Sequence, residues 1–202
     1  YSEKFNFPKP HGGGTAYMNT IDKNGLGVSL IQSNFHGIGS RIGVGSFGFF
    51  LHNRGCGFNL LPGHPNYLTP GKKPLHTLSP TIWSKEGNLE FIAGTRGGRY
   101  QPQLLIQTIL PYIQKIDSFE KIIKEPRWVI ENFSNDTSSK LRFEKINDKD
   151  LEILLQKGHE VEVENQFRKG NGPISIIYKK QDGNFEGVCD VRVGTEKVFN
   201  SS

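Results

Sequence analysis

The sequence lacks the marks of several protein classes. It has 202 residues, with two cysteines and one methionine. Cys56 and Cys189 fit no C-x-x-C metal or redox spacing, so we interpret both as ordinary thiols. No apolar run approaches the roughly 18 residues that a membrane-spanning helix needs. The chain begins at Tyr1, which leads us to expect a piece of a longer or processed protein and leaves the cell compartment open.

Metal and nucleic-acid binding also lack their usual patterns. The histidines form no H-E-x-x-H or H-x-x-x-H spacing, so no metal site is predicted. The six histidines are His11, His36, His52, His64, His76 and His159. The net charge is +5, but the basic residues are scattered among 20 acidic ones. This mixture is typical of a solvated surface rather than a nucleic-acid-binding face.

Two glycine motifs resemble known sites but lack their context. Gly43–Gly48 satisfies G-x-G-x-x-G, yet aromatic, strand-like residues follow where a dinucleotide-binding fingerprint requires a helix. His11–Gly14 resembles the oxyanion motif of lipases, but no G-x-S-x-G nucleophile motif occurs downstream. Neither motif therefore predicts a nucleotide cofactor or a serine hydrolase.

Glycine and aromatic residues, by contrast, are abundant, as expected for a β-rich domain with many tight turns. Hydrophobic alternation around turn residues predicts three hairpins, over residues 15–33, 82–93 and 174–193. A further strand is predicted over 47–51. Prolines and glycines interrupt every candidate helix in 53–80, so we expect a loop there.

Apolar residues at helical spacing predict three helices. The first spans 103–115 despite Pro111, and the second spans 117–124. The third spans 148–157 and is closed by Gly158 at its C-terminal end. Hairpins together with a helical layer predict an α+β sandwich.

The stretch HGGGT, which ends at Thr15, carries the candidate chemistry. If the Gly14–Thr15 bond is cleaved, Thr15 gains an α-amine with a pKa of roughly 7.7–8.0. This amine can act as the base for the threonine's own hydroxyl. A glycine before the threonine permits the strained backbone that self-cleavage needs. The same residues also fit a flexible loop entering a strand, so this stretch alone leaves both interpretations open.

The rest of the chain separates these interpretations. Several segments follow Thr15 in a distinctive order, and PGKKP, S-P-T and a later glycine pair are specific in combination. The segments are 15–22, 28–33, 37–40, 51–55, 70–81, 94–98, Pro126–Arg127, and Asp190 with Arg192. In this order they resemble the small, catalytic subunit of the γ-glutamyltranspeptidase family, whose members are N-terminal-nucleophile hydrolases.

The resemblance implies a fold and a division of the chain. The fold would be a four-layer αββα sandwich, incomplete without a large subunit from the same precursor. Residues 1–14 would be the tail of that large subunit, and 15–202 would be the catalytic domain. The cleavage site would lie between Gly14 and Thr15. The large subunit is the expected partner in a heterodimer, and no metal or organic cofactor is implied.

The resemblance also implies roles for individual residues. Thr15 would be the nucleophile for self-cleavage and catalysis. Ser33 stands where the family has a threonine that hydrogen-bonds the nucleophile. Gly97 and Gly98 match a glycine pair whose backbone N–H groups form the oxyanion hole. The residues matched to substrate contacts are Asn53, Arg54, His76 and Thr77.

The implied activity is acyl transfer or hydrolysis of γ-glutamyl amides such as glutathione. The sequence departs from the transpeptidase pattern after Asn53, where the acidic residue that holds the substrate's α-amino group is missing and Gly57 stands near its position. Ala16 replaces a second threonine. The pattern is more similar to an acylase-like branch of the family. Two alternatives therefore stand beside the transpeptidase: an acylase for a non-glutamyl acid, such as a glutaryl or cephalosporin acylase, and a silent homologue that is never cleaved.

Overall fold

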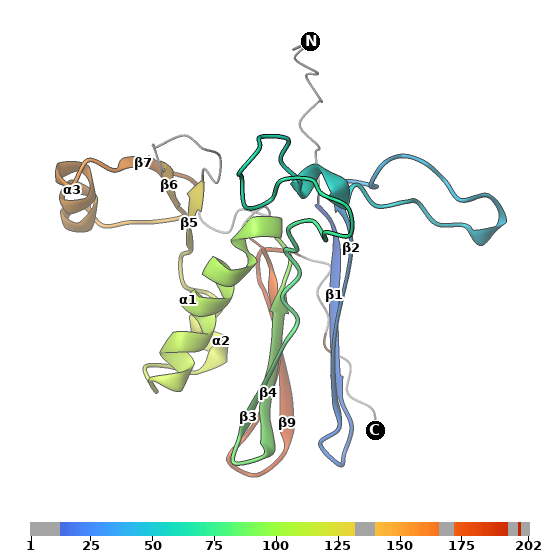
Figure 1. Ribbon diagram of the computed structural model, residues 1–202. Coiled ribbons are helices and arrows are strands. Elements are labelled where there is room, and N and C mark those ends of the chain that lie inside the picture. Colours follow the sequence, from blue (N-terminus) through green and yellow to red (C-terminus); the bar gives the residue numbers. More distant parts are fainter. Residues whose placement is uncertain (1–12, 132–139, 166–171, 194–197, 199–202) are drawn as a thin grey trace.

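The fold is described from a computed structural model. This structure describes residues 13–131, 140–165, 172–193 and 198, so most of the predicted tail over 1–14 lies outside the described residues. The elements form a helical layer, a four-stranded sheet and a two-stranded hairpin, which Figure 1 shows edge-on. A smaller sheet with one helix lies at one end.

The central layer is an antiparallel four-stranded sheet. Its strands, in spatial order, are β3 (Thr81–Lys85), β4 (Asn88–Thr95), β8 (Ile174–Lys179) and β9 (Phe185–Cys189). The hairpins predicted over 82–93 and 174–193 are confirmed, because β3 pairs with β4 and β8 pairs with β9. The last strand is shorter than predicted. It ends before Asp190, whose buried carboxylate accepts a hydrogen bond from the Ile174 N–H at 3.0 Å.

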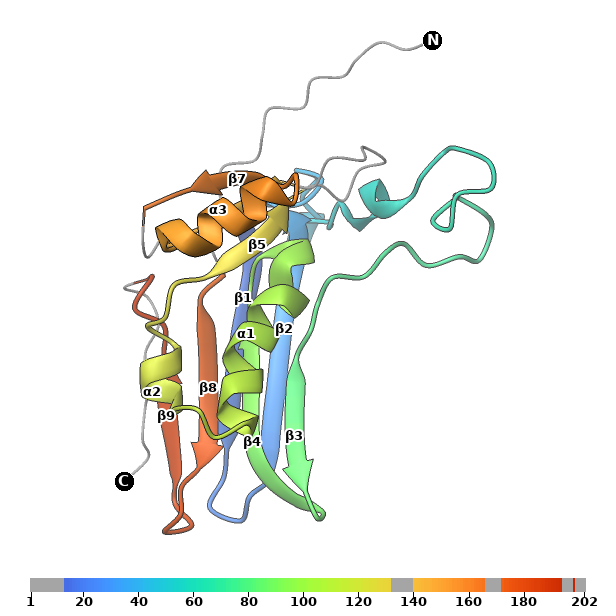
Figure 2. The ribbon, with the colours of Figure 1, turned by 90° about the vertical axis from the view of Figure 1, so that its left-hand side faces the viewer.

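Two helices cover one face of this sheet: α1 (Gln101–Ile113) and α2 (Phe119–Ile122), shown in Figure 2. They confirm the predicted helices, with the second much shorter than expected. The hydrophobic core lies between the helices and the sheet. Its buried residues are Phe91, Ala93, Leu104, Leu105, Ile109, Phe119, Ile123, Val129, Ile174, Ile176 and Val188. Tyr112 stacks on Phe119 with ring centroids 3.8 Å apart.

The opposite face of the sheet carries the hairpin of β1 (Gly13–Ile21) and β2 (Gly27–His36), which confirms the first predicted hairpin. Close packing joins the two sheets. A Cβ on Gly94 would lie 2.1 Å from the Tyr17 ring, so only a glycine fits there. The Asn19 amide donates a hydrogen bond to the Ser175 carbonyl at 3.3 Å. Among the described residues, these elements supply three of the four layers of the expected sandwich.

The smaller sheet was not predicted. It orders β5 (Trp128–Glu131), β6 (Lys140–Phe143) and β7 (Glu160–Val163), and α3 (Asp148–Gln156) connects the parallel pair β6 and β7. The predicted third helix is confirmed as α3. Asn147 caps its start by accepting the Asp150 N–H at 2.9 Å, and Gly158 follows its end at φ +84°.

The strand predicted over 47–51 is wrong. The chain there forms a 3₁₀ turn, Gly45–Phe47, followed by Gly48 at φ +69°. Phe50 makes only an isolated bridge with Gly43. Alternating aromatic residues favour a strand, but a strand also needs neighbours on which its side chains can pack. Phe47 and Phe49 are 77% and 52% exposed, so their side chains are not packed as those of a strand would be.

Candidate active site

The hairpin brings two of the predicted site residues together. Its register places Thr15 opposite Ser33, and their hydroxyl oxygens are 2.8 Å apart. Thr15 is buried. The Ser33 oxygen also accepts the Phe35 N–H at 2.9 Å, which fixes the serine hydroxyl in place. Ser33 can therefore orient the Thr15 hydroxyl by hydrogen bonding, as the resemblance implies.

Gly14 has a steric reason to be glycine. A Cβ at this position would lie 1.8 Å from the carbonyl oxygen of Gly37, far inside van der Waals contact. The strand register is also irregular here, between Gly13 and Thr15. This packing accounts for the glycine whether or not the following bond is cleaved.

Asn53 holds the loop that follows β2. Its side-chain oxygen accepts the His36 N–H at 2.9 Å. Its amide nitrogen lies within hydrogen-bond distance of the carbonyls of His36 and Gly39, at 3.3 and 3.1 Å. Both ends of the amide are thus engaged by the loop, and a substrate contact for Asn53 stays a prediction.

Arg54 and Thr77 form a second pair. Arg54 is 6% exposed, and its Nη1 donates to the Thr77 hydroxyl at 2.7 Å. The guanidinium also lies over the Phe35 ring, 4.2 Å from its centroid, a cation–π contact. Phe35 therefore connects this pair to Ser33, whose oxygen accepts its N–H.

The glycine pair lies between the end of β4 and the start of α1. Gly97 has φ +136° and Gly98 has φ +58°, a backbone that favours glycine at both positions. Gly98 opens a 3₁₀ turn, Gly98–Tyr100. Within the described part of the chain, no acceptor takes the N–H of Gly97 or Gly98. Two adjacent backbone donors without a protein acceptor suit an oxyanion site.

A cleft of about 660 Å³ lies beside Gly98, the second glycine of the pair. Its lining includes Cys56, Gly57, His76, Thr77, Gly98 and Arg99. It thus brings together three predicted residues, His76, Thr77 and Gly98. Thr15, Ser33, Asn53 and Arg54 do not line it, although Arg54 contacts it through Thr77. No aspartate or glutamate lines this cleft among the described residues.

Sequence reasoning named Arg54 but missed Arg99, which lines this cleft. Burial lowers the pKa of His36, and nearby Arg99 and Arg54 lower it further. Burial raises the pKa of the Cys56 thiol, against the opposing effect of the same two arginines. Arg99 directly follows the glycine pair, and this adjacency is the signal by which it could have been found.

Gln101 was also missed. It is fully buried at the start of α1, and its side-chain oxygen accepts the Ser79 N–H at 2.9 Å. This bond attaches the segment that carries His76 and Thr77 to the helix that follows the glycine pair. The sequence showed Gln101 only as part of the QPQ segment after the glycine pair, and gave no sign of this role because its partner is a backbone group 22 residues away.

Comparison with known proteins identifies the family. The profile described as Gamma-glutamyltranspeptidase matches residues 1–199. The chain belongs to the γ-glutamyltranspeptidase family. Two curated relatives of this family member are similar over most of its length.

The glutathione hydrolase-like YwrD proenzyme of Bacillus subtilis is 35% identical over 185 residues, which cover 91% of this chain and 35% of that protein. The oxamate amidohydrolase proenzyme of Klebsiella pneumoniae is 33% identical over 189 residues, which cover 91% of this chain and 36% of that protein. The γ-glutamyltranspeptidase-family chain described here thus spans about a third of the length of these relatives.

Solved structures confirm the predicted α+β fold of the N-terminal-nucleophile hydrolase type. A cephalosporin acylase from Bacillus halodurans matches with a TM-score of 0.74 at 29% identity, covering 87% of this chain and 32% of that chain. A γ-glutamyltranspeptidase from Pseudomonas nitroreducens matches with a TM-score of 0.74 at 22% identity, covering 91% of this chain and 99% of that chain.

Two kinds of feature are absent from the described residues. No helix among them combines the length and apolar character needed to cross a membrane. No cluster of three or more histidine, cysteine, aspartate or glutamate side chains in the described ranges could hold a metal ion.

Proposed function

We propose that this chain is the catalytic part of an amide hydrolase or acyl transferase that uses Thr15 as its N-terminal nucleophile. The observation that carries the proposal is the 2.8 Å contact between the hydroxyls of Thr15 and Ser33. The names of the two curated relatives, both hydrolase proenzymes, support this reading. The division at Gly14–Thr15, with residues 15–202 as the catalytic domain, is part of the same proposal.

The chemistry follows from the groups present. After cleavage, the Thr15 α-amine accepts the proton of its own hydroxyl as Oγ1 attacks the amide carbonyl. The N–H groups of Gly97 and Gly98 stabilise the oxyanion of the tetrahedral intermediate. The C–N bond then breaks, and the departing amine takes the proton from the α-ammonium. Water or another amine attacks the acyl-enzyme in the same way and restores Thr15.

A large subunit from the same precursor is the proposed partner. The outward face of the hairpin supports it, because Met18, Val28 and Leu30 lie on this face and are each about half exposed at 51%, 49% and 49%. An apolar strand face of this kind normally packs against another layer. The length of the relatives, about three times that of this chain, is enough to supply such a layer.

Two substrate classes are candidates. The first is a γ-glutamyl amide such as glutathione, the usual substrate implied by the family. The second is an amide of an acid without an α-amino group, such as a glutaryl amide. A specific observation favours the second: the cleft has Arg99 and two histidines but no described carboxylate, so it offers no counter-charge for an α-ammonium group.

Cleavage tests the nucleophile. The full-length precursor should yield a fragment whose N-terminus is Thr15, identified by intact mass and N-terminal sequencing. Thr15→Ala should leave the precursor uncut, and turnover should fall by about 10³-fold or more because the nucleophile is gone. A wild-type precursor that stays uncut and releases no p-nitroaniline from γ-glutamyl-p-nitroanilide or glutaryl-p-nitroanilide would make this chain a silent homologue.

Substrate preference requires a separate comparison on cleaved protein. We expect glutaryl-p-nitroanilide to be hydrolysed at least as fast as γ-glutamyl-p-nitroanilide, at equal concentration and pH. Introducing a carboxylate by Gly57→Asp should shift the ratio of kcat/KM toward the γ-glutamyl substrate, with Gly55→Asp as a control in the same 3₁₀ turn, Arg54–Gly57. A strong preference of the wild type for the γ-glutamyl substrate would show instead that γ-glutamyl amides are the substrate class.

A further inference from the structure

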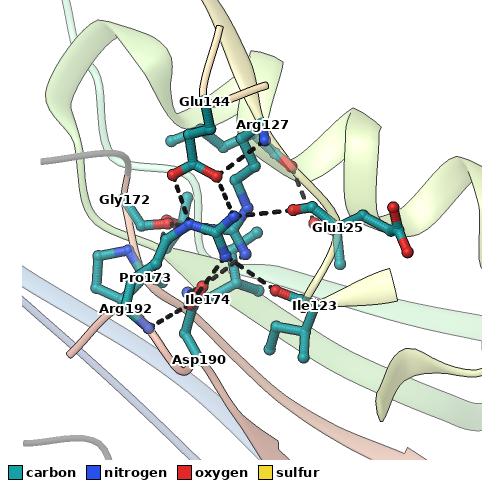
Figure 3. A network of polar contacts seen from close by, with 12 residues as sticks. Ile123, Glu125, Arg127, Glu144, Gly172, Pro173, Ile174, Asp190 and Arg192 are labelled. Atoms are coloured by element: carbon teal, nitrogen blue, oxygen red, sulfur yellow. Dashed lines mark hydrogen bonds and ion pairs between the residues drawn. The ribbon is translucent and has the colours of Figure 1, made fainter. Parts of the chain in front are cut away.

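A buried network of charged side chains connects the small sheet to the central sheet (Figure 3). It contains Arg127, Glu144, Asp190 and Arg192, each at most 3% exposed. Two positive and two negative charges balance. Full burial of charges is costly unless every group is paired, and here each arginine lies within ion-pair distance of a carboxylate.

Arg127 uses its two terminal nitrogens in different directions. Nη2 forms an ion pair with Asp190 Oδ2 at 2.5 Å. Nη1 donates to the carbonyl oxygen of Gly172 at 2.7 Å. The same Asp190 oxygen accepts the Ile174 N–H at 3.0 Å. Arg127 and Asp190 together therefore fix the backbone from Gly172 to Ile174, as Figure 3 shows.

Gly172 packs directly behind the glycine pair. A Cβ on Gly172 would lie 2.2 Å from the carbonyl oxygen of Arg96 and 2.9 Å from the Thr95 hydroxyl. That hydroxyl is within hydrogen-bond distance of both the Arg96 and the Pro173 carbonyls, at 3.0 and 2.9 Å. A Cβ on Gly97 would lie 3.7 Å from the Gly172 Cα. The backbone at Gly172 is thus a close-fitting support for the Arg96–Gly97 peptide.

A rigid peptide group transmits this support to the proposed oxyanion site. The Arg96 carbonyl and the Gly97 N–H belong to one planar peptide unit, so the position of the oxygen sets the direction of the N–H. Gly97 itself, at φ +136°, has no side chain that could lock this orientation. The orientation therefore depends on the groups packed around the Arg96 carbonyl.

We propose that Arg127 is a positioning residue for the oxyanion-binding glycine pair. Its hydrogen bond to the Gly172 carbonyl keeps Gly172 packed against the Arg96 carbonyl. This packing in turn fixes the direction of the Gly97 N–H. Arg127 itself touches no reacting atom. This inference rests on the proposed function, in which Gly97 and Gly98 bind the oxyanion. Lysine cannot replace arginine here, because one ammonium group does not reproduce two donors held in a fixed planar fork.

The test uses the full-length precursor, and wild type is measured first. If the wild-type precursor neither cleaves itself nor hydrolyses either p-nitroanilide substrate, the proposed function is wrong and this inference, which rests on it, is wrong too. If wild type is active, Arg127→Lys is compared with Arg192→Lys. Arg192 is equally buried in the same network, but it donates to Glu144, to the other oxygen of Asp190 (Oδ1, at 3.1 Å) and to the carbonyls of Ile123 and Glu125, whereas the Gly172 carbonyl is held by Arg127.

We expect both lysine variants to lower the Tm. Per cleaved molecule, Arg127→Lys should lower kcat about 10- to 100-fold with KM within about twofold, because a misaimed donor acts on the transition state. Arg192→Lys should change kcat by less than about threefold, since it leaves the Gly172 contact in place. Equal losses of kcat in the two variants, or an unchanged kcat in Arg127→Lys, would overturn the inference.

A second pair of variants covers the case in which Arg127→Lys does not fold. Gly172→Ala keeps all four charges but pushes a Cβ onto the Arg96 carbonyl, so kcat should fall while KM holds. Its control is Gly183→Ala, because Gly183 also has a positive φ, +88°, but open space where a Cβ would stand. Equal kcat values in these two variants would contradict the positioning role.

Discussion

The hairpin β1–β2 and the central sheet differ in which of their side chains are buried. In the central sheet, apolar side chains such as Phe91 and Ile176 point into the core beneath the helices and are 3% and 1% exposed. In the hairpin, the row that faces the central sheet is largely polar, with Thr15 and Ser33 at one end. Its outward row carries Leu30, which is 49% exposed.

This difference separates stability from catalysis. The central sheet and its helices enclose a cluster of buried apolar side chains, whereas the hairpin leaves its apolar row uncovered among the described residues. The candidate nucleophile belongs to the second region. Under the proposed function, a partner that covers the hairpin therefore completes the part of the molecule that carries the chemistry, and the helical side serves as its support.

The largest effect should come from the helical side. Phe119→Ala removes a fully buried ring that packs on Phe91 and Tyr112, and it should lower the free energy of unfolding by about 3–5 kcal/mol. Ile116→Ala is the control, because Ile116 is 68% exposed nearby and should cost less than about 0.5 kcal/mol. Urea denaturation of the 202-residue chain measures both, and similar losses would mean that the core lies elsewhere.

A charge on the outward row of the hairpin tests the need for a partner. In the full-length precursor, Leu30→Asp should reduce the recovery of an associated two-chain complex by about tenfold, because an unpaired carboxylate would be buried. Ile106→Asp on α1, where Ile106 is 55% exposed, should leave recovery unchanged. Co-purification of the two fragments measures the effect. If Leu30→Asp assembles normally, the partner does not cover this face.

The contrast also explains what sequence could predict. The hairpin register was predictable, since local turn chemistry sets it: the Asp22 carboxylate accepts the N–H groups of Asn24 and Leu26 at 2.8 Å each, and Gly25 has φ +84°. This turn alone places Thr15 opposite Ser33. The helices were predictable for the same reason, because their apolar spacing is local.

Features that depend on distant contacts were beyond sequence reasoning. The strands β5, β6 and β7 have four residues each, too few to show a period, and they form only by pairing with one another. Arg54 meets Thr77 across 23 residues of chain. Arg127 and Asp190 were recognised as parts of a family pattern, but their common contact with the Gly172–Ile174 backbone appears only in the fold.

Two serines of β2, Ser33 and Ser29, allow a catalytic role to be tested separately from a packing role. Ser33→Ala removes the partner of the Thr15 hydroxyl, and cleavage of the precursor should slow by about tenfold, close to the value of one hydrogen bond. Ser33→Thr should restore it. Ser29→Ala is the matched control, because Ser29 hydrogen-bonds the Tyr17 hydroxyl at 2.9 Å instead. Equal rates for the two alanine variants would remove Ser33 from the mechanism.

The smallest effect is a pH dependence that only the central sheet should show. The Tyr178 hydroxyl donates to Glu120 at 2.5 Å. Burial raises the pKa of Glu120, but hydrogen bonds with Ser118 and Tyr178 outweigh it and leave the pKa below the ordinary 4.5. Because the carboxylate binds its proton less readily in the folded state, this stabilisation is present above pH 4.5 and is lost as the pH falls through the folded pKa.

Tyr178→Phe should therefore cost about 1 kcal/mol at pH 7 and less at pH 3, because lowering the pH shifts Glu120 toward its protonated form. Tyr17→Phe is the counterpart in the hairpin. Burial raises the pKa of Tyr17, so its hydrogen bond with Ser29 joins two neutral groups throughout this range. The cost of Tyr17→Phe should be the same at both pH values. Urea denaturation at pH 3 and 7 measures all four values, and a pH-independent cost for Tyr178→Phe would mean that its bond to Glu120 does not depend on the charge of the carboxylate.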